Sequence, residues 1–290
     1  MEHYTTDGLL GAAEEACRAG RPREAQSLLD QWWDSSPRAA SQDVVILYTI
    51  DDPHTIRQLK LENAAREGYS FLVSFLLGQG AEITNSVLAA ARNSNSTEVF
   101  QAFLDHGWDI NELYWGTTSL SGVLKSDKLV DWHLEHGADP NLHLGRGGTP
   151  LERAAVEGSV HAVKSLMSHG ARLEGSDALI AAAASMNENP EPIKIMAHLL
   201  DSGVDINRLQ NVRDPDAATP LTGTALHQAV ERGDAERVRF LLQRGANRDV
   251  KGFQGLTALE AAEAMRLNQM ADVLRSERPD VIGNTVSLSS

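Results

Sequence analysis

Residues 223–249 read GTALHQAVERGDAERVRFLLQRGANRD, and this stretch indicates a pair of short helices joined by a turn. Thr224 stands just before the first apolar segment, where its hydroxyl suits the free backbone N–H groups of a helix start. Gly233 lies where that segment ends, and Gly245 lies where the next one ends. Both glycines suit the positive φ that commonly closes a helix. The stretch therefore predicts two helices, each with its own stop signal.

The second helix of this stretch is amphipathic. Three apolar residues fall at i, i+3 and i+4 spacing and so share one face: Val238, Leu241 and Leu242. A single antiparallel helix pair cannot bury such a face by itself. It must therefore stack on neighbouring pairs of the same kind.

The stretch resembles one ankyrin repeat. Thr224-Ala225-Leu226-His227 stands where that family has Thr-Pro-Leu-His. The other signature positions are matched by Ala229, Gly233, Val238, Leu241-Leu242 and Gly245-Ala246. The resemblance implies that His227 has a structural role, in which its ring bridges the backbones of neighbouring loops.

Imperfect copies of this stretch recur along the chain. Residues 149–155 read TPLERAA, and the threonines at 224 and 257 are 33 residues apart, the period of an ankyrin repeat. The clear units are Leu59–Ile83, Ser86–Asn111, Thr118–Asn141, Thr149–Glu174, Asp177–Asn207, the stretch at 223–249, and Thr257–Arg275.

The resemblance predicts an all-α ankyrin-repeat solenoid of about seven to eight helix-turn-helix units with short fingers, the loops that join successive units. Residues 1–58 are interpreted as a degenerate N-terminal helical capping region, 59–275 as the array, and 276–290 as a disordered tail. Residues 209–223 lengthen one finger, and we expect this insertion to contact a ligand or partner.

Composition excludes several classes of protein. The formal net charge is −14, which argues against a nucleic-acid binder because such a protein needs clustered Lys and Arg. No apolar run is long enough to span a bilayer, and the N-terminus lacks the pattern of a signal peptide. The single cysteine, Cys17, fits a reducing compartment. We therefore expect a cytoplasmic or nuclear protein with no membrane partner.

No motif for chemistry stands out, so no catalytic residue, metal ligand or cofactor is predicted. His133 and His136 share a helix face, but no cysteine pair or His-Glu-x-x-His accompanies them. The glycine-rich segment 145–148 lacks the Lys and Ser/Thr of a phosphate-binding loop.

Departures from the repeat pattern predict a binding site. Tyr114, Trp115, His143 and Arg146 fall on two successive fingers, where small polar residues are usual. Lys125 and Arg153 are expected to border them on the exposed face of the following first helices. His133 replaces the Phe or Leu of the other units, either as a ligand-binding residue or as a satisfied core histidine. Aromatic side chains beside cations predict an interaction hot spot for a carboxylate-bearing ligand.

The sequence thus favours a non-catalytic binding scaffold that recognises a protein or peptide through the concave groove implied by the ankyrin resemblance. The alternative is an ankyrin-like protein whose groove binds a small molecule, with or without acid–base catalysis by a His or an acidic residue. A deep aromatic-lined pocket would favour that alternative, and an open groove would favour the scaffold.

Overall fold

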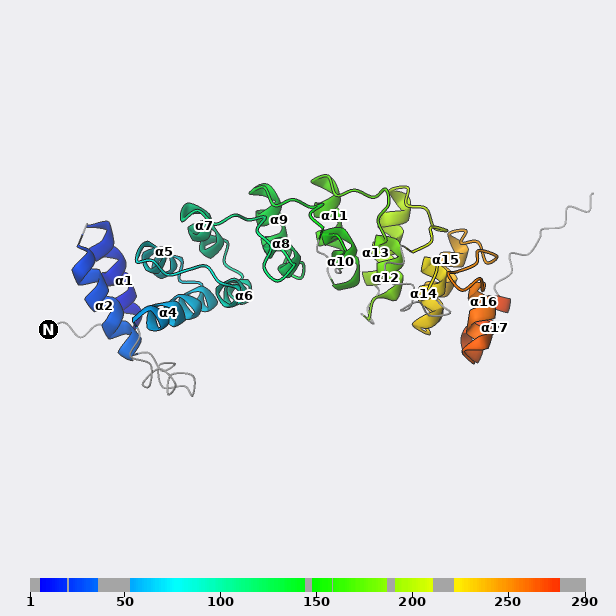
Figure 1. The fold of residues 1–290 in the computed structure, drawn as a ribbon, viewed down its shortest axis with the longest axis horizontal. Helices are drawn as coiled ribbons and strands as arrows, with labels where there is room; N and C mark the ends of the chain where they lie inside the picture. Colours follow the sequence, from blue (N-terminus) through cyan, green and yellow to red (C-terminus); the bar gives the residue numbers. More distant parts are fainter. Residues whose placement is uncertain are drawn as a thin grey trace, which may run out of the picture. The chain divides into compact units, whose positions relative to one another are not determined.

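A computed structural model of the chain describes residues 6–19, 21–35, 53–143, 148–157, 159–186, 191–210 and 222–276. Within these ranges the regular structure consists of sixteen helices and two isolated β-bridges, so the predicted all-α class is confirmed (Figure 1). The same residues contain no helix with the length and apolar character that crossing a bilayer requires. The chain divides into two compact parts, Met1–Ile110 and Asn111–Ser290.

The N-terminal part contains three helix pairs. They are α1 (Thr6–Arg18) with α2 (Pro22–Ser35), α4 (Pro53–Glu67) with α5 (Ser70–Gly78), and α6 (Asn85–Ser94) with α7 (Thr97–Asp105). The first helices α4 and α6 pack on one another, as do the second helices α5 and α7. The structure starts α4 at Pro53, earlier than the predicted array start at residue 59; proline is favoured at the first helical position because its missing N–H is not needed there.

Aromatic and charged side chains join α2 to the next pair. The ring of Trp32 meets the ring of Tyr69 edge-on, with centroids 5.6 Å apart. The Lys60 ammonium lies 2.8 Å from Asp30 Oδ1 and 5.6 Å from the centroid of the Trp33 ring. The first pair is therefore packed against the array. Residues 36–52, part of the segment 34–58 for which the sequence predicts no definite structure, lie outside the described ranges, as does the tail from 277.

The C-terminal part contains five pairs. They are α8 (Ser119–Gly122) with α9 (Asp127–Glu135), α10 (Pro150–Glu157) with α11 (Val160–Ser168), α12 (Ala178–Ala184) with α13 (Glu191–Asp201), α14 (Ala225–Glu231) with α15 (Ala235–Gln243), and α16 (Ala258–Ala264) with α17 (Asn268–Ser276). The first helices α8, α10, α12, α14 and α16 pack in that order as one row (Figure 1). The second helices form a parallel row, in which α9 packs on α11 and α11 on α13.

The stretch at 223–249 folds as its sequence predicts. Gly233 and Gly245 adopt φ of 68° and 89°, and each follows the end of a helix. Leu241 is fully buried, whereas Leu242 is only half-buried. The core thus runs between the two rows of helices. In the C-terminal part the seventh residue of each nine-residue second helix is buried in it: His133, Leu166, Leu241 and Leu274.

The fingers of the C-terminal part are joined to one another by side-chain bridges. Asn111 donates to the carbonyl of Gly137 at 3.0 Å and accepts from the Asp139 N–H at 2.8 Å. One unit later, Asn141 makes the same two contacts with Gly170 and Arg172. A two-ended amide suits this role, because it satisfies a donor and an acceptor of the next finger together.

The histidine of the signature forms a second kind of bridge, as the resemblance implied. His227 Nδ1 accepts from the Thr224 N–H at 3.2 Å, and Nε2 lies 3.2 Å from the Leu256 carbonyl in the next finger. The network assigns the neutral tautomer with the proton on Nε2, because a carbonyl can only accept. Burial lowers the pKa of His227, and the bond to Leu256 offsets part of that shift.

The lowered pKa predicts a loss of stability in mild acid. Below the ordinary pKa of 6.5 the unfolded chain binds a proton at His227 that the folded chain does not bind, so the free energy of unfolding falls as pH drops. His227→Gln can make both hydrogen bonds without titrating. We expect the wild-type chain to lose on the order of 1 kcal/mol more than this variant between pH 7.5 and 5.5 in urea titrations. Parallel pH profiles would contradict the assignment.

Glu152 occupies the same signature position in its unit and also bridges to the next finger. Its Oε2 accepts from the Thr149 N–H at 3.0 Å, and its Oε1 accepts from the Asp177 N–H of the next finger at 2.9 Å. The carboxylate thus links neighbouring fingers as His227 does, but it accepts at both ends, whereas His227 Nε2 donates to a carbonyl. The substitution from His to Glu in TPLERAA preserves the architecture.

Removing this bridge is expected to destabilise the C-terminal part. Glu152→Ala leaves two backbone donors without partners, and we expect a loss of about 1–3 kcal/mol in the free energy of unfolding. Glu152→Gln keeps one of the two accepting oxygens and should recover part of that loss. A urea midpoint of Glu152→Ala equal to that of the wild type would show that the bridge contributes nothing.

Candidate functional site

The finger at residues 111–118 ends in a tight two-residue turn. The Tyr114 N–H donates to the Thr117 carbonyl at 2.8 Å, and the Thr117 N–H donates to the Tyr114 carbonyl at 3.1 Å. The two residues between them, Trp115 and Gly116, have φ of 51° and 76°. Positive φ at both central positions defines a type I′ turn, which is typical of a tight β-hairpin.

Trp115 is an unusual residue for this position. Type I′ turns favour Asn-Gly or Asp-Gly, because the left-handed conformation costs a larger side chain on the order of 1 kcal/mol or more. The Trp115 side chain is nevertheless 90% exposed, so it recovers little of this cost through packing. A strained, exposed aromatic at a loop tip is a candidate for function.

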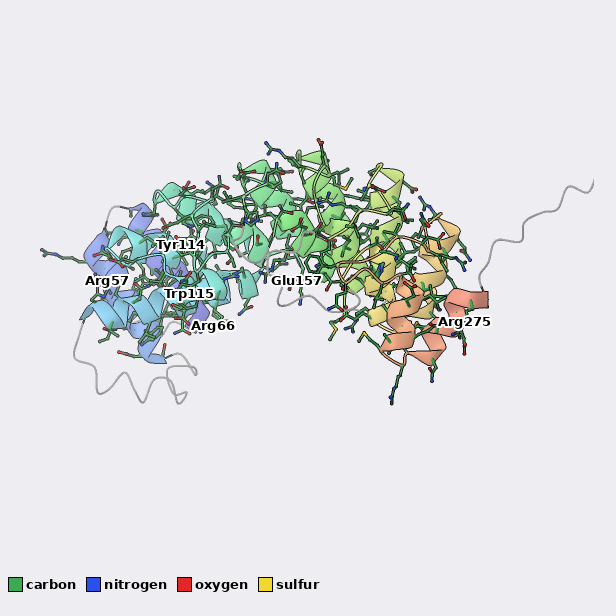
Figure 2. All side chains as sticks on the ribbon, turned by 45° about the vertical axis from the view of Figure 1, so that its right-hand side comes forward. Arg57, Arg66, Tyr114, Trp115, Glu157 and Arg275 are labelled. Carbon is green, nitrogen blue, oxygen red and sulfur yellow. The ribbon has the colours of Figure 1, made fainter. Side chains whose placement is uncertain are left out.

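The residues beside Trp115 give the finger a defined chemistry. The Tyr114 hydroxyl donates to Glu112 Oε2 at 2.5 Å, which holds that carboxylate against the finger. Leu113 is half exposed. Figure 2 labels Tyr114 and Trp115 on their finger. The finger therefore presents an aromatic face, an aliphatic side chain and a fixed negative charge.

The other predicted site residues differ in where the structure places them. Lys125 is exposed, but it lies in the turn after α8 and not on a first helix, because α8 ends at Gly122. Arg153 forms an ion pair with Glu157, 2.5 Å from its Nε, within α10. His143 is exposed, and Arg146 lies outside the described residues, as do 211–221 of the predicted insertion.

His133 belongs to the core. It is fully buried, with Nε2 2.9 Å from Ser119 Oγ and Nδ1 2.7 Å from the Leu129 carbonyl. Its two ring nitrogens are thus both engaged inside the protein. The proposal that His133 binds a ligand is therefore corrected in favour of the other reading, a satisfied core histidine.

The structure adds an exposed apolar residue that the sequence analysis did not select. Met186 follows α12 and is 71% exposed. Its neighbour Ser185 is held from two sides, since its hydroxyl donates to the Val156 carbonyl at 2.6 Å and its carbonyl accepts from Arg237 Nη1 at 2.6 Å. One feature of the sequence could have indicated this contact. Arg237 is the third residue of α15, and the third residues of α9 and α11 are the apolar Leu129 and Ala162.

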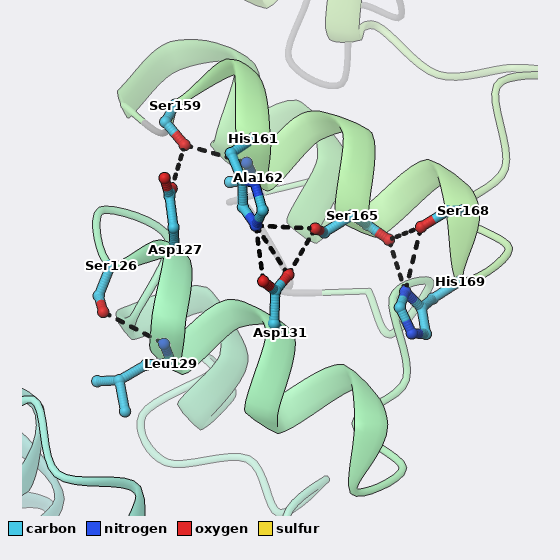
Figure 3. Close-up of polar contacts among 10 residues, drawn as sticks. All are labelled: Ser126, Asp127, Leu129, Asp131, Ser159, His161, Ala162, Ser165, Ser168 and His169. Carbon is cyan, nitrogen blue, oxygen red and sulfur yellow. Dashed lines mark hydrogen bonds and ion pairs between the residues drawn. The ribbon is translucent and has the colours of Figure 1, made fainter.

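A polar cluster connects the second helices α9 and α11 (Figure 3). His161 Nε2 lies 2.8 and 2.9 Å from the two carboxylate oxygens of Asp131, and the Ser165 hydroxyl donates to Asp131 Oδ1 at 2.6 Å. Burial acts to raise the pKa of Asp131. The hydrogen bonds from Ser165 and His161, with the charges of His161 and His169, outweigh that effect and lower it.

This Asp-His-Ser set does not have the geometry of a nucleophile with its base. In such a triad the acid and the serine contact different ring nitrogens of the histidine. Here Asp131 and Ser165 both lie near Nε2, and the serine donates to the carboxylate. Ser159, whose hydroxyl donates to Asp127 Oδ1 at 2.6 Å, adds a further link between the same helices. The cluster is an inter-helix clamp.

The described ranges also contain no group of three His, Cys, Asp or Glu side chains that could hold a metal ion.

Comparison with known proteins matches two parts of the chain to sequence families. Residues 122–210 match the model for ankyrin repeats in three copies, and residues 223–253 match the model for a single ankyrin repeat. Two solved structures share the fold. The human ASB11 ankyrin repeat domain has a TM-score of 0.57 at 22% identity, with 76% of this chain and 98% of that chain covered. The ankyrin repeat protein EF0377 has a TM-score of 0.51 at 23% identity, with 66% and 97% covered.

Curated relatives are similar over part of their length only. Potassium channel AKT1 of Arabidopsis thaliana is 34% identical, over 75% of this chain and 28% of its own. The mitochondrial disaggregase of Homo sapiens is 29% identical, over 67% and 27%. The NF-kappa-B p105 subunit of Gallus gallus is 28% identical, over 59% and 17%. The chain spans less than a third of each of these relatives.

Proposed function

Because this chain is an ankyrin-repeat protein, we propose that it binds a protein partner through its fingers, with Trp115 as the central anchor. Ankyrin repeats are generally modules of protein–protein interaction. Their stacked helices provide a rigid support, and loops on a rigid support commonly carry binding residues. The proposed function is binding without catalysis, since it requires only that the rigid helices present the fingers to the partner.

The single observation that carries this proposal is the exposed indole of Trp115 on its strained turn. Tryptophan is enriched among the residues that dominate binding energy, because it removes a large area from water while losing few rotamers. The turn fixes the backbone beneath the ring before any partner arrives. This arrangement lowers the entropic cost of binding.

Trp115→Asn tests the anchor without disturbing the finger. Asparagine is the favoured residue at this turn position, so the variant should melt at or slightly above the wild-type temperature. Loss of an anchor of about 2 kcal/mol should weaken partner binding roughly 30-fold. The partner is first identified by photo-crosslinking from position 113, where Leu113 is exposed on the same finger and Trp115 stays in place. Its affinity is then measured by titration calorimetry.

Crosslinking from Gln243 serves as the matched control, because this exposed residue lies on the second helix α15 and not on a finger. The partner is the protein that crosslinks from position 113 and not from position 243. Unchanged affinity of Trp115→Asn for that partner would overturn the proposal.

A further inference from the structure

We propose that the finger at residues 111–118 receives a basic segment of the protein partner, whose Arg or Lys side chain lies over the Trp115 indole and pairs with Glu112. This inference rests on the proposed function, and it specifies the chemistry of the partner. Two features of the finger support it: the exposed aromatic ring of Trp115, and the Glu112 carboxylate on the same finger, which a hydrogen bond from Tyr114 positions.

The chain itself contains the arrangement that the finger would complete. In the N-terminal part, Lys60 lies over the Trp33 ring at 5.6 Å and pairs with Asp30 Oδ1 at 2.8 Å. There the chain itself supplies all three components: the aromatic face of Trp33, the cation of Lys60 and the carboxylate of Asp30. Tryptophan is the best aromatic partner for a cation, because its ring face carries the most negative potential.

The finger supplies the same aromatic and carboxylate components but not the cation. Lys60 lies over the Trp33 ring and Arg244 over the Phe240 ring, and neither of these cations lies at Trp115. Arg153, which was expected to border the site, is paired with Glu157. The proposal assigns the place over the Trp115 ring to a cation of the partner.

The carboxylates around the finger are fixed before binding. The Tyr114 hydroxyl donates to Glu112 Oε2, and the second oxygen of that carboxylate can accept a further bond. Asp139 on the next finger is also exposed, and its carboxylate Oδ1 accepts from the Asn141 N–H at 2.8 Å. A fixed carboxylate spends less entropy on pairing with a cation than a freely rotating one.

The charge of the whole chain favours the same partner. With 40 acidic residues against 26 Lys and Arg, the formal net charge of −14 attracts basic segments over a long range and repels acidic ones. This reverses the sign expected from sequence, where Lys125, Arg146 and Arg153 suggested a carboxylate-bearing ligand.

Fluorine NMR of the full chain labelled with 5-fluorotryptophan provides the test. The chain has five tryptophans, and the Trp115 resonance is assigned by its loss in Trp115→Asn. Two probes are titrated: the peptide acetyl-Gly-Arg-Gly-Arg-Gly-amide, and the same peptide with citrulline, a neutral analogue of arginine. We expect the arginine peptide to shift the Trp115 resonance selectively, with the half-buried Trp132 unaffected, and the citrulline peptide to have no effect.

Removal of the carboxylate tests the second half of the inference. Glu112→Gln should raise the dissociation constant of the arginine peptide about threefold, the effect of an exposed ion pair. The control Glu135→Gln removes the same charge from an exposed position on α9 and should change nothing. Equal weakening by both variants would reduce the effect to net charge and overturn the assignment to the finger.

Equal shifts with both peptides, or none with either, would overturn the inference. That result would leave the proposed function intact if Trp115→Asn still weakens binding of the captured partner. The proposed function itself fails only if Trp115→Asn keeps full affinity for that partner, so the two failures are distinguishable.

Discussion

Leu241→Ala is expected to lower the free energy of unfolding by about 2–5 kcal/mol. Leu241 is fully buried on α15, between the rows of first and second helices. Truncating it removes apolar contact area and leaves a cavity, and the closely packed neighbours can only partly fill that cavity. The loss appears as a lower urea midpoint and a lower melting temperature.

Two neighbouring residues on the same helix provide controls for this prediction. Gln243 is exposed, so Gln243→Ala should change stability by no more than about 0.5 kcal/mol. Leu242 is half-buried, and its truncation should fall between the two. Similar small effects at Leu241 and Gln243 would mean that the face of α15 turned to the core has been wrongly identified.

This register could be predicted from sequence because it depends on local rules. Helix stops at Gly233 and Gly245 require only that glycine tolerates positive φ, and the apolar spacing fixes which face is inside. A family period of about 33 residues then places each unit beside its neighbours. The all-α class and the order of the helix pairs follow from these features alone.

Other features depend on contacts between segments far apart in sequence. Arg237 is almost fully buried and donates to the carbonyls of Ala183 and Ser185, more than fifty residues earlier. No spacing rule predicts this contact. The short helix α8 likewise reflects a unit that is two residues shorter than its neighbours. Because α8 ends at Gly122, Lys125 lies in a turn and not on the first helix, where the sequence analysis expected it.

The candidate site was partly predictable for the same reason. The aromatics Tyr114 and Trp115 were visible as departures from the finger pattern, but the type I′ turn that exposes Trp115 is a property of the folded backbone. The ion pair of Arg153 with Glu157 follows the i, i+4 rule and could have been anticipated. That rule would have removed one cation from the predicted patch.

His133→Ala is expected to cost about 3 kcal/mol or more, because it combines a core cavity with an unpaired polar group. His133 is fully buried and bonded to the Ser119 hydroxyl and the Leu129 carbonyl. The carbonyl only accepts, so Nδ1 carries the proton, and Nε2 accepts from the Ser119 hydroxyl. Removing the ring therefore leaves the buried hydroxyl of Ser119 without this partner.

A double-mutant cycle separates the hydrogen bond from the packing. In the pair α14–α15 the positions of Ser119 and His133 are held by Ala225 and Leu241, which are both fully buried and apolar. Ser119→Ala alone should cost about 1–3 kcal/mol by stranding Nε2, and His133→Leu alone should cost a similar amount by stranding the hydroxyl.

Together, Ser119→Ala and His133→Leu remove both polar groups, and the double variant should lie within about 1 kcal/mol of wild type. Urea unfolding of the four proteins measures the coupling. Additive losses would show that Ser119 and His133 are not energetically coupled. A large negative coupling would explain how a histidine persists at a position that other pairs fill with leucine: its hydrogen-bond partner changed with it.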